Sequence, residues 1–184
     1  MYLMITVQTL HCHNLIQIIP ESEGNKKGVD DLTSSLIGNG STKTTKDAFN
    51  EEIDFLGANI GFSSHGAYAS SLSKYAGRIL ELMADGALNP NFIQEEFDKE
   101  IKVVMEERRW RTEDKPTSQV KEQFGSTVFK SHPYSRPVVG WMNDLENMTV
   151  EDAKEWYKNW YAPNNAILVV VGDIYANDVL DLAK

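Results

Sequence analysis

A run of apolar residues near the C-terminus constrains the fold more than any other feature of the sequence. Residues 165–171 form a continuous, largely apolar stretch between Pro163 and Gly172. A short run of this kind is typical of a strand that is buried on both faces. Residues 149–161, just before it, repeat apolar and aromatic side chains at helical spacing, which predicts a helix whose inner, core-facing side carries Ala153, Trp156, Tyr157 and Trp160. A helix followed by a buried strand indicates a chain that mixes both kinds of element.

The remaining sequence predicts further short strands alternating with helices. Apolar residues at period two, stopped by Gly, Pro or Asn, favour strands, and spacings of three and four favour helices. Strands are predicted over 2–9, 15–19, 58–64 and 67–73, and helices over 28–37, 47–56, 79–88, 95–111, 116–128 and 149–161, with a last helix from about 176. His65-Gly66 between the third and fourth of these strands predicts that they form a hairpin. Thr149 and Asp152 resemble a capping box, with Asp in place of Glu, at the start of the helix over 149–161. The predicted class is α+β, with an antiparallel-rich mixed sheet and helices packed on it.

One apolar stripe in this pattern lies on the helix that begins at Pro116. Proline is well tolerated in the first turn of a helix. Val120, Phe124 and Val128 follow at intervals of four, which predicts that they form the helix's apolar stripe.

Composition bounds the domain organisation and excludes several classes of function. The chain has 184 residues, of which 41% are hydrophobic and 24% charged, so we expect one α+β domain over 1–184, incomplete at its C-terminal edge. The net charge of −9 disfavours nucleic-acid and membrane-surface partners. No apolar run reaches the roughly 20 residues of a membrane span, and no signal peptide is recognisable. We expect a soluble protein, without a prediction of its compartment.

Several ordered motifs in the second half of the chain are distinctive as a set. They are residues 102–109 (KVVMEERR), 132–134 (HPY), 139–141 (VGW), 147–149 (NMT), 161–166 (YAPNNA) and 169–173 (VVVGD). Together they resemble the pitrilysin/insulinase family, which includes mitochondrial processing peptidases and bacterial zinc proteases. The likeness runs from about Gly28 to Asp173, with a weaker match over 15–20.

This resemblance implies one half of a unit built from two homologous α+β halves, which enclose a substrate chamber. Active members are inverzincins. Their H-x-x-E-H motif lies on a helix, where two His bind zinc and the Glu is the general base, and a later helix supplies a third ligand, also a Glu. The resemblance therefore implies two partners, a homologous peptidase half or subunit and an extended peptide substrate.

The matching helix in this sequence keeps the spacing of the motif but not its ligands. Asp31 stands at the first His position, Ser34 at the general-base position and Ser35 at the second His position. The third-ligand position falls on Glu107, with Glu100 one heptad earlier as a supporting carboxylate. Two carboxylates and a hydroxyl are harder ligands than zinc prefers and would favour Mg²⁺ or Ca²⁺ weakly. We expect a polar helix face lining an emptied cleft, with no catalytic residue and no cofactor in this chain.

Other candidate groups are weaker. His11 and His13 would share one face of a strand and could pair on a metal, but the sequence identifies no third ligand. Cys12 cannot form an internal disulfide, because it is the single cysteine, and no motif marks it as a catalytic thiol. The arginines at 108, 109 and 111 are flanked by acidic residues, which predicts a salt-paired helix surface rather than a nucleic-acid site.

Three functions remain open at this point. The leading hypothesis is a non-catalytic subunit or half that cooperates with an active homologue in proteolysis and holds extended peptide by strand addition at a sheet edge. A second is a residually active zinc metalloendopeptidase whose ligands come from another register or from a partner chain. A third is a structural assembly subunit, resembling the core proteins of the respiratory chain.

Overall fold

The computed structural model describes residues 2–7, 23–64, 66–162, 164 and 166–183. The chain divides into two compact units. The first, here called the sheet unit, is Met1–Gln17, Ser34–Asn91 and Asn159–Lys184. The second, the helical unit, is Ile18–Thr33 and Phe92–Lys158. Helices α1 (Val29–Leu36) and α7 (Val150–Trp160) contribute residues to both.

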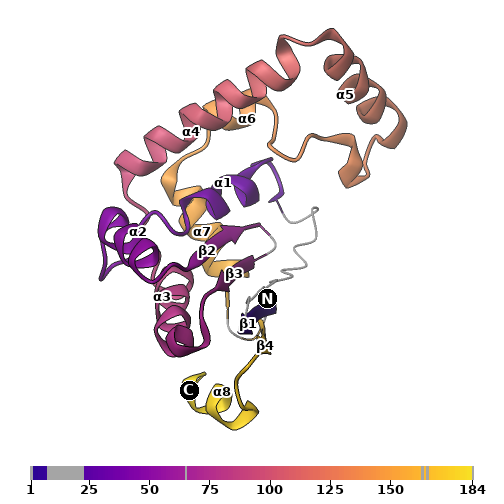
Figure 1. Ribbon diagram of the computed structural model, residues 1–184. Helices are drawn as coiled ribbons and strands as arrows, with labels where there is room; N and C mark the ends of the chain where they lie inside the picture. The colour runs from indigo at the N-terminus through magenta and orange to yellow at the C-terminus, as the bar shows by residue number, and fades with distance from the viewer. Residues whose placement is uncertain (1, 8–22, 65, 163, 165, 184) are drawn as a thin grey trace. The chain divides into compact units, whose positions relative to one another are not determined.

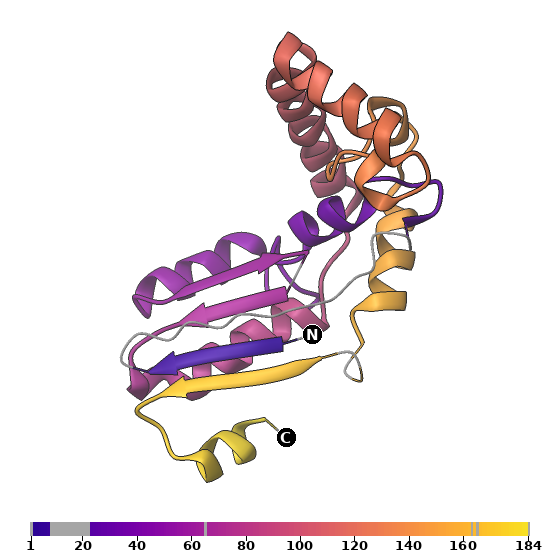
Figure 2. The same cartoon turned by 90° about the vertical axis from the view of Figure 1, so that its right-hand side faces the viewer.

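The sheet unit contains four strands in the order β2-β3-β1-β4 (Figure 2). They are β1 (Tyr2–Val7), β2 (Asn59–Ser63), β3 (Gly66–Ser70) and β4 (Ile167–Gly172). β2 and β3 form the expected antiparallel hairpin, whereas β1 runs parallel to both β3 and β4. The α+β class with a mixed sheet is confirmed. Among the described strands antiparallel pairing is confined to the hairpin, and the strand predicted over 15–19 lies outside the described residues.

The prediction that the C-terminal apolar strand is buried on both faces is wrong. No residue of β4 is fully buried, and Ile167 and Val171 are 46% and 48% exposed. The reason is position in the sheet, because among the described strands β4 pairs only with β1. An apolar run shows that a segment avoids water but does not distinguish a central strand from an edge strand.

Helices α2 (Lys46–Phe55) and α3 (Ala76–Leu88) supply most of the core of the sheet unit (Figure 1). Phe49 of α2 and Ile79 and Met83 of α3 pack in one cluster with Ala69 of β3. Their burial removes apolar surface from water, at roughly 25 cal/mol per Å². A short 3-10 turn, η2 (Ser73–Tyr75), precedes α3, and α8 (Ala176–Leu182) follows β4.

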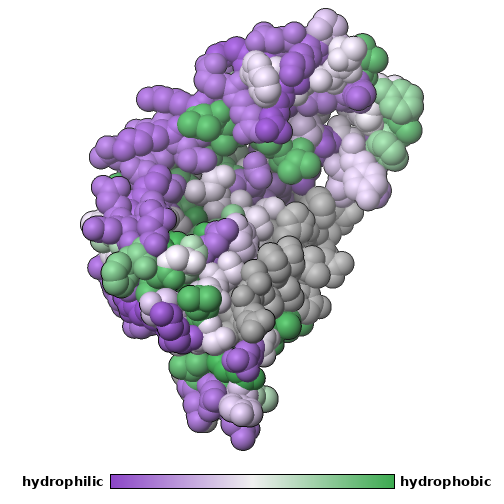
Figure 3. All heavy atoms as spheres, viewed as in Figure 1, coloured by the Kyte–Doolittle hydropathy of each residue, from purple (hydrophilic) through white to green (hydrophobic). Residues whose placement is uncertain are grey.

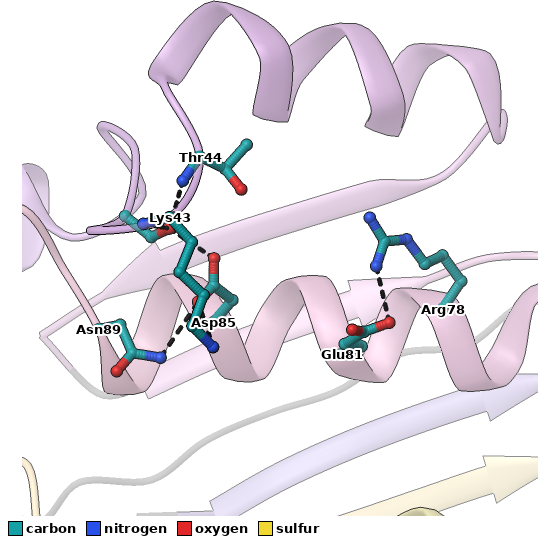
Figure 4. Close-up of polar contacts among 7 residues, drawn as sticks. Lys43, Thr44, Arg78, Glu81, Asp85 and Asn89 are labelled. Atoms are coloured by element: carbon teal, nitrogen blue, oxygen red, sulfur yellow. Dashed lines mark hydrogen bonds and ion pairs between the residues drawn. The ribbon is translucent and has the colours of Figure 1, made fainter.

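A polar network fastens the loop before α2 to the last turns of α3 (Figure 4). The Ser41 hydroxyl donates to Asp85 Oδ2 over 2.5 Å and accepts from the backbone N–H groups of Lys43 and Thr44. Asn89 Nδ2 donates to Asp85 Oδ1 over 3.1 Å. Each partner is satisfied inside the sheet unit, so this serine and aspartate have a structural role.

The helical unit consists of consecutive helices. They are α4 (Gln94–Arg108), the π-helical turn η3 (Arg109–Glu113), α5 (Pro116–Phe129), the 3-10 turn η4 (Pro133–Ser135), α6 (Met142–Glu146) and most of α7. The helix predicted to reach residue 111 is α-helical only to Arg108. The predicted capping box at the start of α7 is confirmed, because Thr149 N donates to Asp152 Oδ2 and Asp152 N donates to Thr149 Oγ1.

Two predictions about this unit need correction. The salt-paired surface holds for Arg109 and Arg111, which pair with Glu106 and Glu107. Arg108 instead is buried, 5% exposed. On α5, the spacing of apolar residues is present, but the stripe is left on the surface, with Val120 68% exposed and Phe124 66% exposed.

Candidate functional site

The candidate site begins at the first turn of α1, which a close backbone crossing positions. Gly28 and Gly140 both have positive φ, +90° and +85°. A Cβ on Gly28 would overlap the carbonyl of Val139, and a Cβ on Gly140 would overlap the carbonyl of Lys27. Only glycine fits where two backbones approach so closely at such φ values. The start of α1 is therefore fixed against the segment that follows η4, within the helical unit.

Three contacts join this turn and the loop before it to α7 and to the residues just before α7. Lys26 Nζ lies 3.0 Å from Asp152 Oδ2 and donates to the Asn147 carbonyl over 3.0 Å. The indole Nε1–H of Trp156 donates to Asp30 Oδ1 over 3.2 Å. Asp30 and Trp156 are 126 positions apart in sequence. This bond joins the motif helix to the aromatic face that the sequence predicted to be core, and Trp156 is buried as expected.

A buried ion pair supports the loop that leads into α1. Arg136 Nη1 lies 2.5 Å from Glu23 Oε2, and the two side chains are 10% and 4% exposed. The other oxygen, Glu23 Oε1, accepts from the backbone N–H of Asp30 over 3.4 Å. Glu23 therefore connects the cation on the η4 side to the first turn of α1. An acidic group at a helix N-terminus is also favoured by the helix dipole.

Burial sets the protonation behaviour of three acids here. Burial is the main cause that raises the pKa of Asp30 to about 7, partly offset by the Trp156 hydrogen bond, while the charges of Glu23 and Asp31 raise it further. Burial likewise raises the pKa of Glu23, with Arg136 acting in the opposite direction. The charges of the two neighbouring acids, Glu23 and Asp31, thus disfavour the ionisation of Asp30.

Two of the residues predicted from the resemblance lie close enough to interact. The pKa of Asp31 is raised, first by burial and then by the negative charge of Glu107. Asp31 on α1 and Glu107 on α4 thus share one electrostatic environment. Glu107 also pairs with Arg111, with Oε1 2.9 Å from Nε. Its carboxylate therefore already has a cationic partner one turn along the chain.

The other predicted positions carry weak ligands. Ser34 and Ser35 follow on α1 at the i+3 and i+4 positions from Asp31, so they share its helix face. Ser34 is buried and Ser35 half-buried. Glu100 lies two turns before Glu107 on α4 and is half-buried. Hydroxyls are poor zinc ligands and poor general bases at neutral pH.

These residues do not fit a zinc ion. Residues 23–64 and 66–162, together with the described remainder, contain no group of three His, Cys, Asp or Glu side chains arranged to hold a metal. The donor set at α1 and α4 consists of carboxylates and hydroxyls, with Glu107 held by Arg111. Zinc sites in proteases use two imidazoles and a carboxylate. The predicted cluster of His11, Cys12 and His13 lies outside the described residues.

Sequence reasoning missed the interactions that anchor this site. Asp30 and Glu23 belong to no motif that the sequence makes recognisable. The partners of both lie more than 100 positions away, in Trp156 and Arg136. A buried acid needs a partner, but no local signal in the sequence marks either residue as buried.

Comparison with known proteins places this site in a family. The sequence profile described as insulinase (peptidase family M16) matches residues 21–141, and the profile described as the peptidase M16 inactive domain matches residues 147–184. Zinc protease PqqE of Helicobacter pylori is 33% identical over 150 residues, covering 77% of this chain and 34% of that protein. An uncharacterised zinc protease of Rickettsia felis is 26% identical over 163 residues, covering 86% of this chain and 39% of that protein.

Solved structures agree with the sequence matches. A protease from Helicobacter pylori superposes with a TM-score of 0.80 at 27% identity, covering 91% of this chain and 42% of the other. A peptidase M16 inactive domain from Pseudomonas fluorescens gives 0.77 at 23% identity, covering 90% and 41%; at that identity the likeness shows the fold alone. The chain thus spans between a third and a half of the length of each of these four proteins. Among the described residues, no helix is long and apolar enough to cross a membrane.

Proposed function

Because the chain belongs to the insulinase family of peptidases, peptidase family M16, we propose that it is a non-catalytic half that cooperates with an active homologue in proteolysis. The observation that carries this proposal is the chemistry of the motif helix. By the family resemblance, Asp31 and Ser35 of this helix stand at the positions of the two zinc-binding histidines and Ser34 at that of the general base. Without imidazoles and a base, this helix has no means to activate a water molecule.

The scaffold around that helix supports the proposal. The first turn of α1 remains tightly anchored, by the Gly28–Gly140 crossing and by the Trp156 hydrogen bond to Asp30. Glu107 keeps the third-ligand position, close enough to Asp31 to raise its pKa. A domain whose architecture persists while its ligands are exchanged is expected to serve binding or assembly rather than hydrolysis.

The sheet offers a means of holding an extended peptide. β2 lies at one edge of the described sheet and pairs only with β3 there. The outward N–H and C=O groups of an edge strand can receive an added strand, with backbone bonds supplying affinity and neighbouring side chains supplying selectivity. In this proposal, the active homologue performs the cleavage and this chain contributes to holding the substrate.

Hydrolysis assays test the proposal directly. The purified chain, supplied with zinc, is expected to leave unstructured peptides intact and to bind them with an affinity that chelators do not change. A Glu107→Ala variant is expected to bind the same peptides equally well. Hydrolysis by the pure chain that chelator abolishes and Glu107→Ala removes would overturn the proposal in favour of a residually active zinc endopeptidase. A stable complex with a homologue but no peptide affinity would instead favour a purely structural subunit.

A further inference from the structure

Helix α5 carries a stripe of apolar side chains that the described chain leaves uncovered. Val120, Phe124 and Val128 are 68%, 66% and 54% exposed. Residues four apart lie on one side of a helix, so these three form a continuous stripe, here called the α5 stripe. Hydrophobic surface gathers along the outer edge of the region where α5 lies (Figure 3). Exposed apolar surface organised on one helix face marks an interaction site more often than scattered apolar residues do.

A hollow of about 230 Å³ adjoins the same helix. Lys121, Glu122 and Gly125 of α5 line one side, and residues 134–137 line the other. Gly125 contributes no side chain, and a Cβ at this position would lie 3.4 Å from the Tyr134 carbonyl oxygen on the opposite side of the hollow. Lys121 directly follows Val120 and lies two turns before Val128, so helical periodicity places it at the margin of the α5 stripe.

Of the cationic side chains at or next to this hollow, two form ion pairs with described acids of the same chain and one does not. Arg108 binds the Glu122 carboxylate through both terminal nitrogens, over 3.1 and 3.0 Å, and its guanidinium lies 5.4 Å from the Trp141 ring centroid. Arg136 is likewise committed to Glu23. Among the ion pairs formed by described residues, none includes Lys121. A positive site therefore remains beside the stripe, in a chain whose net charge is −9.

We propose that the α5 stripe and the Lys121 hollow together dock an acidic amphipathic helix of another protein. Its apolar side chains would lie across Val120, Phe124 and Val128, and one carboxylate would enter the hollow beside Lys121. A row of apolar side chains four positions apart on one helix packs into the grooves between such rows on a second helix, and the cation beside the row selects the charge of the partner. A second copy fits less well, because the carboxylate that α5 could offer, Glu122, is held by Arg108.

A designed peptide tests the proposal on the full chain. The peptide is a helix of about four turns with leucines one turn apart and one glutamate beside them, and its counterparts carry lysine or glutamine at the glutamate position. Fluorescence anisotropy of the labelled peptides measures affinity. We expect the glutamate peptide to bind most tightly. Phe124→Ser should lower the affinity for the glutamate peptide at least about ten-fold. Lys121→Glu should lower it about three- to ten-fold. The lysine peptide should regain affinity on the Lys121→Glu variant.

Controls come from α4, which also carries an exposed lysine and an exposed apolar side chain. Lys102→Glu and Val103→Ser change an exposed lysine and a valine that is 57% exposed and should leave peptide affinity unchanged. All four substitutions affect exposed side chains, so circular dichroism should show no loss of helix.

Three results would overturn the proposal. One is the absence of binding by the glutamate peptide. Another is equal weakening by the α4 and α5 substitutions. The third is a stable dimer of this chain, seen by sedimentation, that Val120→Ser dissociates, because it would show that a second copy covers the stripe.

Discussion

The indole of Trp156 donates a hydrogen bond to Asp30 over 3.2 Å, joining the middle of α7 to the first turn of α1. The carboxyl group that accepts it is largely withdrawn from water, and its pKa is raised to about 7. This bond and the neighbouring pair of Glu23 and Arg136 hold the helix on which an active relative would carry its metal ligands. The helix start is therefore an anchored element, whatever residues occupy its inner face.

Replacing Trp156 with phenylalanine tests the contribution of this bond. The change keeps an aromatic ring in the core but leaves Asp30 without its donor. Above about pH 8, where Asp30 is ionised in the fold, a hydrogen bond to a charged group contributes roughly 1.5–3 kcal/mol, so at that pH Trp156→Phe should lower the free energy of unfolding by about that amount. Urea denaturation measures it. Trp110, 61% exposed, provides the control, since Trp110→Phe should change stability little; equal effects would contradict the account.

The raised pKa of Asp30 predicts how stability depends on pH. Its pKa is 3.8 in an unperturbed chain and about 7 in the fold. Between these values the folded state binds a proton that the unfolded state lacks, so the free energy of unfolding falls as pH rises from about 4 to about 7. Asp30→Asn keeps an oxygen to accept the Trp156 bond and removes the titration. The fall should therefore become shallower in this variant.

The control for this prediction is Asp173→Asn, which changes an exposed aspartate that follows β4. It should leave the slope as in the parent. Some slope should persist in Asp30→Asn, because the pKa values of Glu23 and Asp31 are also raised. If the free energy of unfolding of Asp30→Asn falls with pH as steeply as that of the parent, the Asp30 carboxyl must be ionised in the fold throughout the range from about pH 4 to about pH 7.

The buried pair of Arg136 and Glu23 predicts a large effect from removing one partner. Arg136→Met leaves Glu23 as a buried acid without its cation, which should cost about 3–5 kcal/mol of unfolding free energy. Adding Glu23→Gln should restore much of the loss. By contrast, Lys154→Met breaks a surface pair with Glu151 and should cost less than about 1 kcal/mol. Thermal unfolding of the parent and these three variants compares them, and equal losses from Arg136→Met and Lys154→Met would refute the assignment.

The crossing of two glycines makes a further prediction. Gly140→Ala would place a methyl group against the Lys27 carbonyl, whereas at Gly57, which also has positive φ, the added methyl meets open space. Both substitutions carry the conformational cost of a positive φ, about 1 kcal/mol, but only Gly140→Ala adds the clash. We therefore expect a clearly larger loss of stability from Gly140→Ala, measured by urea denaturation. Equal losses of stability would mean that the two backbone segments at Gly28 and Gly140 leave room for a methyl group, contrary to their close approach in the fold.

Much of the fold could be predicted because its signals are local. The hairpin, the capping box at Thr149 and the proline that begins α5 were recognisable, since each depends on residues a few positions apart. The burial of β4 could not be predicted. An apolar strand has the same sequence pattern at the edge and at the centre of a sheet. How deeply it is buried depends on which strands become its neighbours.

The candidate site was predictable only in outline. The spacing of Asp31, Ser34 and Ser35 follows from their order in the sequence, and the placement of Glu107 came from the family resemblance. The partners of Asp30 and Glu23 lie far along the chain, so only tertiary structure reveals them. The exposure of the α5 stripe could not be predicted for the same reason, because periodicity identifies an apolar helix face but not what covers it.

Zinc content is the most direct test of the central claim, that this motif helix no longer holds a metal. The protein is purified without chelator, dialysed against micromolar zinc and analysed by elemental analysis. The account predicts negligible zinc in the parent chain. It predicts one zinc per chain in a variant with Asp31→His and Ser35→His, whose imidazoles would join Glu107, and loss of that zinc when Glu107→Ala is added. One zinc per chain in the parent, lost on Glu107→Ala, would contradict the account.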